Sequence, residues 1–234
     1  GFSGDGGLAS QAKLWHPAGL AFDSQGALLI ADSRNHCVRR VTPWGMVTTW
    51  LGGEYDDANL NTPTGLATDS AGYIYVAQLG DMLYRFGPMG RSEAVKLDDA
   101  QGAAGIADVA VDSLGRAYFI HGDRVRRVDP ATGKIETVAG GGYTLAPGDY
   151  GPAVDALLKA PRGVALDVAG NLYIAESGTH RIRKVSPGGV ITTFAGLGMA
   201  GHYGDGGPAA LATLQAPYGV AAELGGGILV ADTG

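Results

Sequence analysis

Histidine is the residue type in this 234-residue sequence whose chemistry would be easiest to recognise, and the chain has five. His36 and His180 each come just before a short run that alternates basic and aliphatic residues, whereas His16, His121 and His202 stand alone. A zinc site needs three or four converging ligands, and this spacing does not bring three histidines together. We therefore expect His36 and His180 to bond turn backbone groups, and we keep His16 and His121 as binding candidates.

Aspartates recur at a second set of regular positions. Four of them begin a four-residue stretch that ends in glycine, as in DSQG and DVAG: Asp23, Asp69, Asp112 and Asp167. This order is typical of a type I turn, so we predict a turn role for them rather than acid–base work. Asp81 and Asp108 break the pattern and are better candidates for a metal or an acid–base role.

The sequence shows no clear candidate for a catalytic nucleophile. The single cysteine, Cys37, stands where two other copies of the basic run have Arg124 and Arg181. An activated thiol needs a neighbouring base or cation, and none can be placed, so we expect a packed or partly exposed thiol. The G-x-S-x-G pattern of serine hydrolases is also missing.

All these positions belong to an internal repeat of about 40–45 residues. A complete unit reads PAGLAFD, a glycine turn, ALLIAD, NHCVRRV, a Pro/Gly turn and MVTTWLG. Each stretch alternates apolar and polar residues, as half-buried antiparallel strands do. Because one four-stranded sheet cannot bury both faces alone, the units must stack. The predicted fold is all-β, a β-propeller of four-stranded antiparallel blades.

We expect a single propeller domain over residues 1–234, with four complete repeats and a half repeat. The expected blades are blade 1 (14–53), blade 2 (60–98), blade 3 (103–141), blade 4 (158–197) and half blade 5 (214–234). The count favours a fragment of a larger ring. An open blade would also expose strand edges, so self-association through the incomplete fifth blade is a further expectation.

Three blades are preceded by a long glycine-rich connector. The connectors read GDGGLASQAKLWHP (4–17), GDYGPAVDALLKAP (148–161) and GDGGPAALATLQAP (204–217). We expect each to clamp one blade to the next, with a short helical turn at its centre capped by the preceding polar loop. An ion-binding or anion-binding loop is the alternative, although GDGG lacks the Lys-Ser/Thr of a P-loop and the ordered carboxylates of an EF-hand.

The NH-x-[IV]-R-[RK]-V run, the I-A-[DE] strand before it and the P-x-G-[LV]-A start resemble the NHL repeat. GDGGPA before the next P-x-G-V-A is similar to the bacterial and teneurin-like form of that family. The resemblance covers the whole chain and implies a propeller, usually of six blades. It is weaker in unit 2, which reads QLGDMLYRF, and in unit 3, where His121 replaces Asp32 or Glu176.

The resemblance also implies what an enzyme of this architecture would need. Peptide-amidating lyases look like NHL propellers and place zinc-binding histidines directly after the strand-opening proline. The matching positions here hold Ala18, Thr64, Arg162 and Tyr218. We expect no cofactor, with calcium or zinc as the candidates if a metal is bound. A metal-dependent, lactonase-like hydrolase or lyase at the central channel mouth remains the enzymatic alternative.

The net charge of −6 argues against nucleic acid as a partner, because phosphate binding needs a basic surface. We expect Arg39, Arg126 and Arg183 to pair with acidic residues of the neighbouring blade. No stretch approaches the roughly 18 apolar residues of a membrane span. The teneurin-like resemblance implies a secreted, periplasmic or cell-surface protein.

Departures from the repeat are where a site would be placed. Aromatic residues with polar neighbours suit a protein, peptide or glycan ligand. The candidate binding residues are Trp15, His16, Tyr55, Asp57, Asp81, Tyr84, His121, Tyr150, Arg162, Tyr203 and Tyr218. The favoured function is a non-catalytic binding or scaffold module that uses the rim formed by the connectors. A structural assembly segment of a larger surface protein is the third alternative.

Overall fold

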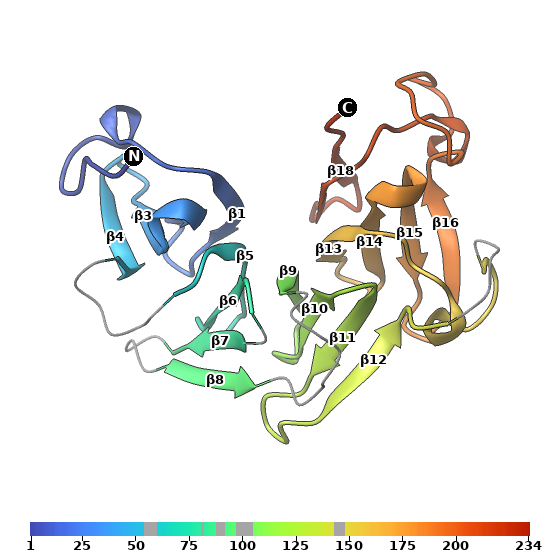
Figure 1. Ribbon diagram of the computed structural model, residues 1–234, viewed down its shortest axis with the longest axis horizontal. Coiled ribbons are helices and arrows are strands. Elements are labelled where there is room, and N and C mark those ends of the chain that lie inside the picture. The colour runs from blue at the N-terminus through green and yellow to red at the C-terminus, as the bar shows by residue number, and fades with distance from the viewer. Residues whose placement is uncertain (54–59, 81, 88–91, 97–104, 143–147) are drawn as a thin grey trace. The chain divides into compact units, whose positions relative to one another are not determined.

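In this computed structural model the described residues are 1–53, 60–80, 82–87, 92–96, 105–142 and 148–234. The chain divides into two compact units, Gly1–Val111 and Asp112–Gly234. Figure 1 shows antiparallel strands in both units, joined by turns and long connectors. None of the helices among the described residues is long and apolar enough to cross a membrane.

Unit 1 contains two four-stranded antiparallel sheets in which each strand pairs with the next along the chain. The first consists of β1 (Pro17–Phe22), β2 (Leu28–Asp32), β3 (Cys37–Val41) and β4 (Val47–Gly52). The second consists of β5 (Pro63–Thr68), β6 (Ile74–Gln78), β7 (Met82–Phe86) and β8 (Ser92–Lys96). β9 (Ile106–Val111) ends the unit.

Unit 2 repeats this design. β10 (Ala117–His121), β11 (Arg124–Val128) and β12 (Ile135–Ala139) pair in order. A four-stranded sheet follows, made of β13 (Pro161–Leu166), β14 (Leu172–Glu176), β15 (Arg181–Val185) and β16 (Ile191–Ala195). β17 (Gly219–Ala222) and β18 (Ile228–Ala231) form a two-stranded sheet. The prediction of an all-β chain built of antiparallel propeller blades is confirmed.

The turn between the first and second strands is made as predicted. The Asp23 carboxylate accepts hydrogen bonds from the backbone N–H groups of Gln25 and Ala27, and Gly26 N–H closes the turn onto the Asp23 carbonyl. Asp69, Asp112 and Asp167 bond the equivalent N–H groups. These carboxylates are therefore occupied by backbone donors.

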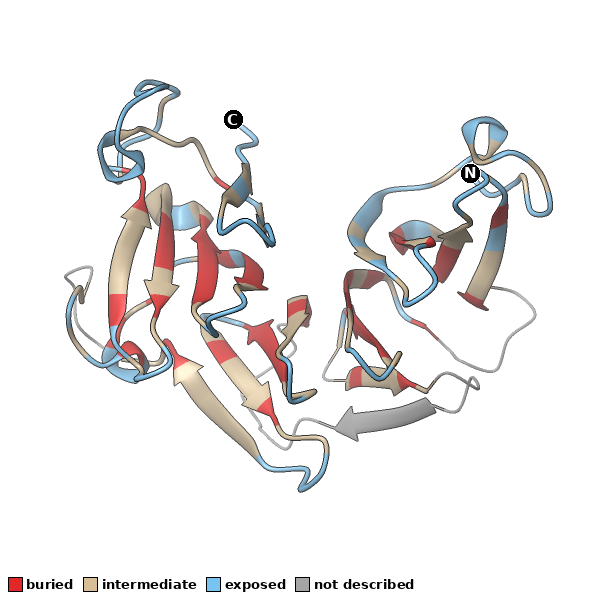
Figure 2. Ribbon diagram, turned by 180° about the vertical axis from the view of Figure 1, so that it is seen from behind, coloured by how far each residue is buried: buried red, intermediate tan, exposed pale blue. Residues whose placement is uncertain are grey.

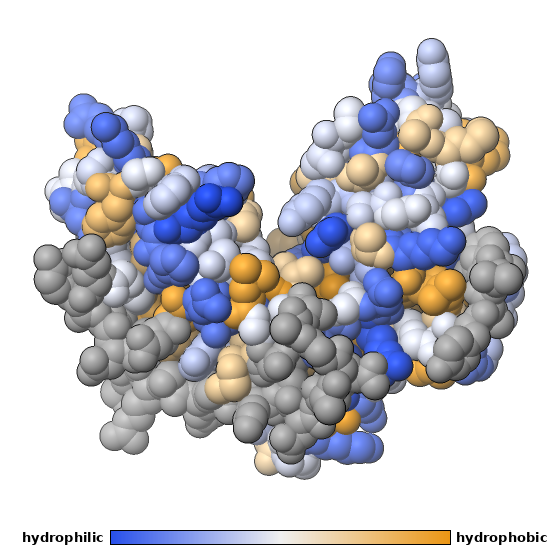
Figure 3. Space-filling model, in the orientation of Figure 1, coloured by the Kyte–Doolittle hydropathy of each residue, from blue (hydrophilic) through white to orange (hydrophobic). Residues whose placement is uncertain are grey.

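Figure 2 shows that the buried residues belong mainly to the strands, whereas exposed residues lie mainly on turns and connectors. In unit 1 the cluster joins the first sheet, through residues such as Leu29 and Val38, to Leu66 and Val76 of the second. In unit 2 Ile182 and Tyr173 pack against Val220 and Val230. On the face drawn in Figure 3, hydrophobic and hydrophilic residues are interspersed over each unit. Stacking of successive blades thus supplies the burial that one blade lacks.

Each long connector contains a single 3-10 turn in its Ala/Leu-rich centre. These turns are η1 (Ala9–Gln11), η3 (Ala153–Asp155) and η5 (Ala209–Leu211). The helical turn was predicted, but its capping was not predicted correctly: the N-cap residues are Leu8, Pro152 and Pro208, and none makes a side-chain cap.

The middle connector clamps two sheets of unit 2, as predicted for this segment. Its Ala153 carbonyl accepts a hydrogen bond from Gly140 N–H just beyond β12, and its Tyr150 N–H donates to Ile191 of β16. The connector therefore joins the outer strand of one sheet to the outer strand of the next.

The glycine of three P-x-G starts, Gly19, Gly65 and Gly163, permits a close approach to the next first strand or its edge. A Cβ built on Gly19 of β1 would lie 2.7 Å from the Cα of Gly65 and 2.8 Å from the N of Leu66, both in β5. These neighbours are backbone atoms, so no side-chain movement can relieve the overlap. β1 and β5 are therefore held at a distance that only glycine allows at this position.

We predict that Gly19→Ala lowers the free energy of unfolding by about 1–3 kcal/mol, the usual cost of overpacking. Urea denaturation followed by fluorescence measures it. Gly225→Ala is the matched control, because a Cβ there meets nothing within 4 Å, and its effect should stay within about 0.5 kcal/mol. Equal stability of the two variants would contradict the close-approach explanation.

Candidate functional site

In four repeats a polar residue at the end of the second strand, or just beyond it, holds the chain as it enters the same blade. Asp32 Oδ1 accepts a 2.6 Å hydrogen bond from Trp15 N–H, and Glu176 Oε1 accepts one of 2.8 Å from Lys159 N–H. Gln78 and Asp232 make the same bond to residues 61 and 215. In every case the donor lies 17 residues earlier. This position is therefore a repeated structural latch.

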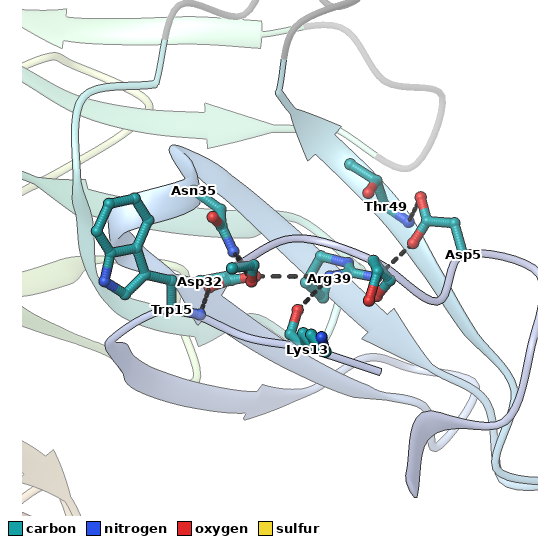
Figure 4. Close-up of polar contacts among 9 residues, drawn as sticks. Asp5, Lys13, Trp15, Asp32, Asn35, Arg39 and Thr49 are labelled. Carbon is teal, nitrogen blue, oxygen red and sulfur yellow. Dashed lines mark hydrogen bonds and ion pairs between the residues drawn. The ribbon is translucent and has the colours of Figure 1, made fainter. Parts of the chain in front are cut away.

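In the first blade the Asp32 carboxylate also holds a buried arginine. Arg39 of β3 is fully buried, and its Nη1 lies 3.5 Å from Asp32 Oδ2. Its Nη2 donates to Asp5 of the N-terminal connector, and Asp5 Oδ2 accepts a 3.0 Å bond from Thr49 N–H of β4. Figure 4 shows this row running from Asp32 through Arg39 to Asp5 and Thr49.

The fourth blade repeats the arrangement in unit 2. Arg183 Nη2 lies 2.6 Å from Asp149 of the middle connector, and Nη1 lies 3.3 Å from Glu176. The expectation that these arginines pair with the neighbouring blade is wrong for Arg39 and Arg183. Both pair with the second strand of their own blade and with the connector that precedes it.

The pKa of the Asp5 carboxyl is lowered. Burial alone would raise it, but hydrogen bonds from Thr49 and Arg39, together with the Arg39 charge, outweigh burial. The same balance lowers the pKa of Asp23, where the donors are Ala27, Arg40 and Gln25. In both cases the surrounding hydrogen bonds and charge favour the ionised form of the carboxyl group.

A pocket of about 820 Å³ lies beside this row in unit 1. Its walls come from the N-terminal segment, the end of the loop between β2 and β3, and the end of β4. The lining residues are Phe2, Asp5, Arg34, Asn35, His36, Thr49, Trp50, Leu51, Gly52 and Gly53. Aromatic rings, an amide and a carboxylate thus share one cavity, a combination typical of a small-ligand or side-chain site.

Two of the sequence candidates lie near the pocket. Trp15 is about half exposed, and the Arg34 guanidinium lies over its ring, 5.8 Å from the centroid. Arg34 also lines the pocket, so it links Trp15 to this site. The neighbouring His16 is exposed and has a φ of 54°.

Two other candidates are partly or fully buried. Tyr84 is partly buried and stacks on Phe86, with ring centroids 6.0 Å apart, in the core of unit 1. His121, kept as a binding candidate from the sequence, is buried at 4% exposure. It ends β10 at the position that holds the latch residue in the other blades.

The unit 2 candidates are exposed but sit on separate elements. Tyr150 lies in the middle connector, Arg162 on β13, Tyr203 in the last connector and Tyr218 immediately before β17. Tyr203 stacks on His202. The remaining candidates, Tyr55, Asp57 and Asp81, lie outside the described residues.

Within the described ranges no group of three or more His, Cys, Asp or Glu side chains is placed to hold a metal ion. Cys37 is fully buried. Burial and the Asp32 charge raise the pKa of its thiol to about 12, so it is the packed residue that the sequence suggested rather than a nucleophile.

Sequence reasoning missed most of the pocket. Phe2, Asn35 and Trp50 occupy unremarkable positions, and they meet only because the N-terminal segment folds back over β3 and β4. One signal was visible: Cys37 replaces the arginine of other repeats.

The model of the NHL repeat matches this chain twice, at residues 14–41 and 158–185. These segments contain the P-x-G strand, the latch residue and the arginine run described above. The chain carries NHL repeats. A zebrafish teneurin-3 is 32% identical over 161 residues, which are 62% of this chain and 6% of that protein. A mouse teneurin-3 is 26% identical over 251 residues, covering 99% of this chain and 8% of that protein. This NHL chain therefore spans only a small part of these relatives.

Solved structures share the fold at low identity. An auxiliary nutrient binding protein from Bacteroides thetaiotaomicron has a TM-score of 0.73 at 18% identity, over 94% of this chain and 57% of that one. A gluconolactonase from Xanthomonas campestris has 0.67 at 16%, over 94% and 71%. Virginiamycin B lyase from Staphylococcus aureus has 0.62 at 16%, over 92% and 63%. These likenesses show the propeller architecture of the NHL chain.

The histidine of the NHL motif joins one repeat to the next. His36 Nδ1 accepts a 3.1 Å hydrogen bond from Thr62 N–H, and His180 Nδ1 accepts one of 3.0 Å from Ala216 N–H. All four residues have positive φ, so each bond fixes two strained positions at once. The prediction that His36 and His180 bond turn backbone groups is confirmed.

We predict that His180→Ala destabilises the NHL chain by about 1–3 kcal/mol, because it leaves the Ala216 N–H without its acceptor. Urea unfolding measures the loss. His202→Ala is the control, since His202 is exposed and its removal should change stability by less than about 0.5 kcal/mol. An unchanged unfolding midpoint for His180→Ala would refute the joining role.

We also predict an acid-labile contribution from Asp5. Its folded pKa lies below the unfolded value of about 3.9, so its stabilisation is present above that pH and is lost as pH falls through the folded pKa. The urea midpoint of Asp5→Asn, measured between pH 7 and pH 3, should fall less on acidification than that of the unmodified chain. Asp205→Asn, in the exposed last connector, is the control and should follow the unmodified chain.

Proposed function

We propose that this chain is a non-catalytic NHL-repeat propeller segment that binds a protein, peptide or glycan at the connector side of its first repeat. The observation that carries the proposal is the pocket of about 820 Å³. It lies where the N-terminal connector, the loop after β2 and the end of β4 meet. Its size suits a side chain with its flanking groups or a small saccharide.

The state of the chemical groups supports binding rather than turnover. Asp23, Asp69, Asp112 and Asp167 are engaged by turn N–H groups. Asp32 and Glu176 hold arginines and backbone donors. His36 and His180 accept backbone hydrogen bonds. A general acid or base needs a free position toward substrate, whereas these groups are committed to the fold.

Location and assembly form part of the proposal. The resemblance to teneurin-type repeats favours a secreted, periplasmic or cell-surface protein, and the one cysteine is buried and free, so the fold needs no disulfide. The neighbour named as a nutrient binding protein agrees with a binding role, and those named as a lyase and a gluconolactonase represent the enzymatic alternative. Self-association through β18 represents the assembly alternative.

The test is a binding screen of the purified chain against short peptides and oligosaccharides, followed by tryptophan fluorescence and NMR. Phe2→Ala, which removes a half-exposed lining ring, should weaken a bound ligand about five- to tenfold, or roughly 1–1.4 kcal/mol. Trp44→Ala is the matched control, because Trp44 is 84% exposed and does not line the pocket. The Trp44→Ala variant should bind the same ligand with unchanged affinity.

Three results would overturn the proposal. Turnover of a lactone or cyclic peptide substrate in the presence of calcium or zinc would establish an enzyme. A stable oligomer by light scattering, with no ligand bound by any panel member, would favour the assembly role. Equal loss of affinity in both aromatic variants would place the binding surface elsewhere.

A further inference from the structure

The pocket in the first repeat corresponds to a place that an arginine side chain fills in the fourth. Arg181, the first residue of β15, donates through Nη2 to the Leu197 carbonyl at 3.0 Å and through Nη1 to the Thr179 carbonyl at 3.5 Å. A Cβ built on Gly198 would overlap its guanidinium. The group therefore lies flat over the chain that leaves the fourth strand.

The third repeat has the same feature. Arg124 begins β11, and a Cβ built on Gly141 would lie 2.9 Å from its Nε. The two glycines are not at the same repeat position: Gly141 directly follows the glycine at the end of the last strand, and Gly198 lies one residue further on. Gly141 is therefore the counterpart of Gly53 in the first repeat. An internal arginine thus closes this end of the blade twice.

The first repeat keeps the backbone of this place but lacks the side chain. Cys37 pairs with Asp32 in the register in which Arg181 pairs with Glu176. His36 and His180 have φ values of 52° and 56°, and Gly52 and Gly196 have values of 78° and 90°. The thiol of Cys37 is fully buried and short, so it cannot reach over the end of β4.

The pocket borders this place through the backbone on either side of Cys37 and at the end of β4, although Cys37 itself does not line it. Asn35, His36, Gly52 and Gly53 line it, and a Cβ on Gly53 would meet no atom within 4 Å. By the repeat, the carbonyls of Asn35 and Gly53 stand where those of Thr179 and Leu197 receive the Arg181 guanidinium. The first repeat therefore has the backbone acceptors of a guanidinium site but no arginine at position 37 to fill it.

The remaining lining groups favour a donor with a flat cationic face. Backbone carbonyls only accept hydrogen bonds, so an anionic ligand has nothing to give them. Trp50 adds an aromatic side chain to the lining, and a guanidinium stacks well on an indole ring. Phe2 and Asp5 are already engaged by Arg39, which lies over the Phe2 ring and pairs with the Asp5 carboxylate. Arg34 is the opposing cation, but its guanidinium is drawn over Trp15. Carbonyl acceptors and a stacking face together therefore favour a cationic guanidinium as the ligand.

We infer that the pocket receives an arginine side chain presented by a polypeptide partner, in the place that Arg181 fills within repeat 4. The inference rests on the proposed binding function and narrows its ligand class. A polypeptide is favoured because the cavity of about 820 Å³ exceeds one guanidinium and leaves room for the residues beside the arginine.

The test uses the whole chain and three matched peptides, acetyl-Ala-Arg-Ala-amide and its lysine and citrulline counterparts. The amide signal of Gly53 and the indole signal of Trp50 report binding by NMR. The arginine peptide should give saturable shifts. The citrulline peptide, equal in shape but neutral, should bind at least about tenfold more weakly.

Variants taken from the repeat itself sharpen the test. Cys37→Arg restores the internal occupant and should weaken the arginine peptide at least about tenfold, while Cys37→Ala keeps the place open and should bind within about twofold of the unmodified chain. Arg181→Cys opens the same place in repeat 4 and should raise the stoichiometry from one peptide to two. Amide signal dispersion confirms that each variant is folded.

The outcomes separate this inference from the proposed function. Equal binding of the arginine and citrulline peptides, or unchanged binding by folded Cys37→Arg, overturns the arginine assignment. Binding of a saccharide at the pocket while all three peptides fail also overturns it and leaves the binding module standing. If neither the peptides nor the wider panel bind, both proposals fail.

Discussion

A buried guanidinium between two carboxylates organises each of the two best-formed repeats. Arg39 and Asp32 are both fully buried, and an ion pair in that position is stable only when its hydrogen-bonding groups are nearly all satisfied. Removing one partner of such a pair typically costs about 3–5 kcal/mol. The pair ties β2 to β3, and Asp5 extends it to the connector and β4. The walls of the pocket therefore depend on this row of charges.

The second repeat fills the space of this ion pair with two uncharged side chains. Tyr84 stands where Arg39 stands, and Gln78 stands where Asp32 stands. Gln78 keeps the hydrogen bond to the entering backbone, while Tyr84 packs on Phe86. Both members of the ion pair have changed together, as expected if an unpaired buried charge is not tolerated. The latch is the constant feature of these repeats, and the ion pair is one way of filling the space beside it.

Strand order, turn chemistry and the role of the motif histidines could be predicted because each follows from local spacing. The partners of Arg39 could not, since Asp5 lies 34 residues earlier and the turn-like GDGG suggested no ion pair. His121 was a binding candidate because it departs from the repeat, yet the end of the second strand is buried in the described blades with four strands. The pocket could not be predicted because it depends on the N-terminal segment folding back beside Asn35.

A repeat protein carries its own comparison, because each repeat shows what the others would contain if they were unchanged. Arg181 covers the end of its blade but must order a long side chain, and a partly exposed, hydrogen-bonded arginine of this kind contributes only about 1 kcal/mol. The absence of this arginine from the first repeat therefore costs little stability. It leaves the neighbouring backbone carbonyls in place, because they belong to a four-stranded sheet. A binding site formed in this way needs no new scaffold: replacing one side chain in one repeat exposes groups that the fold had already arranged.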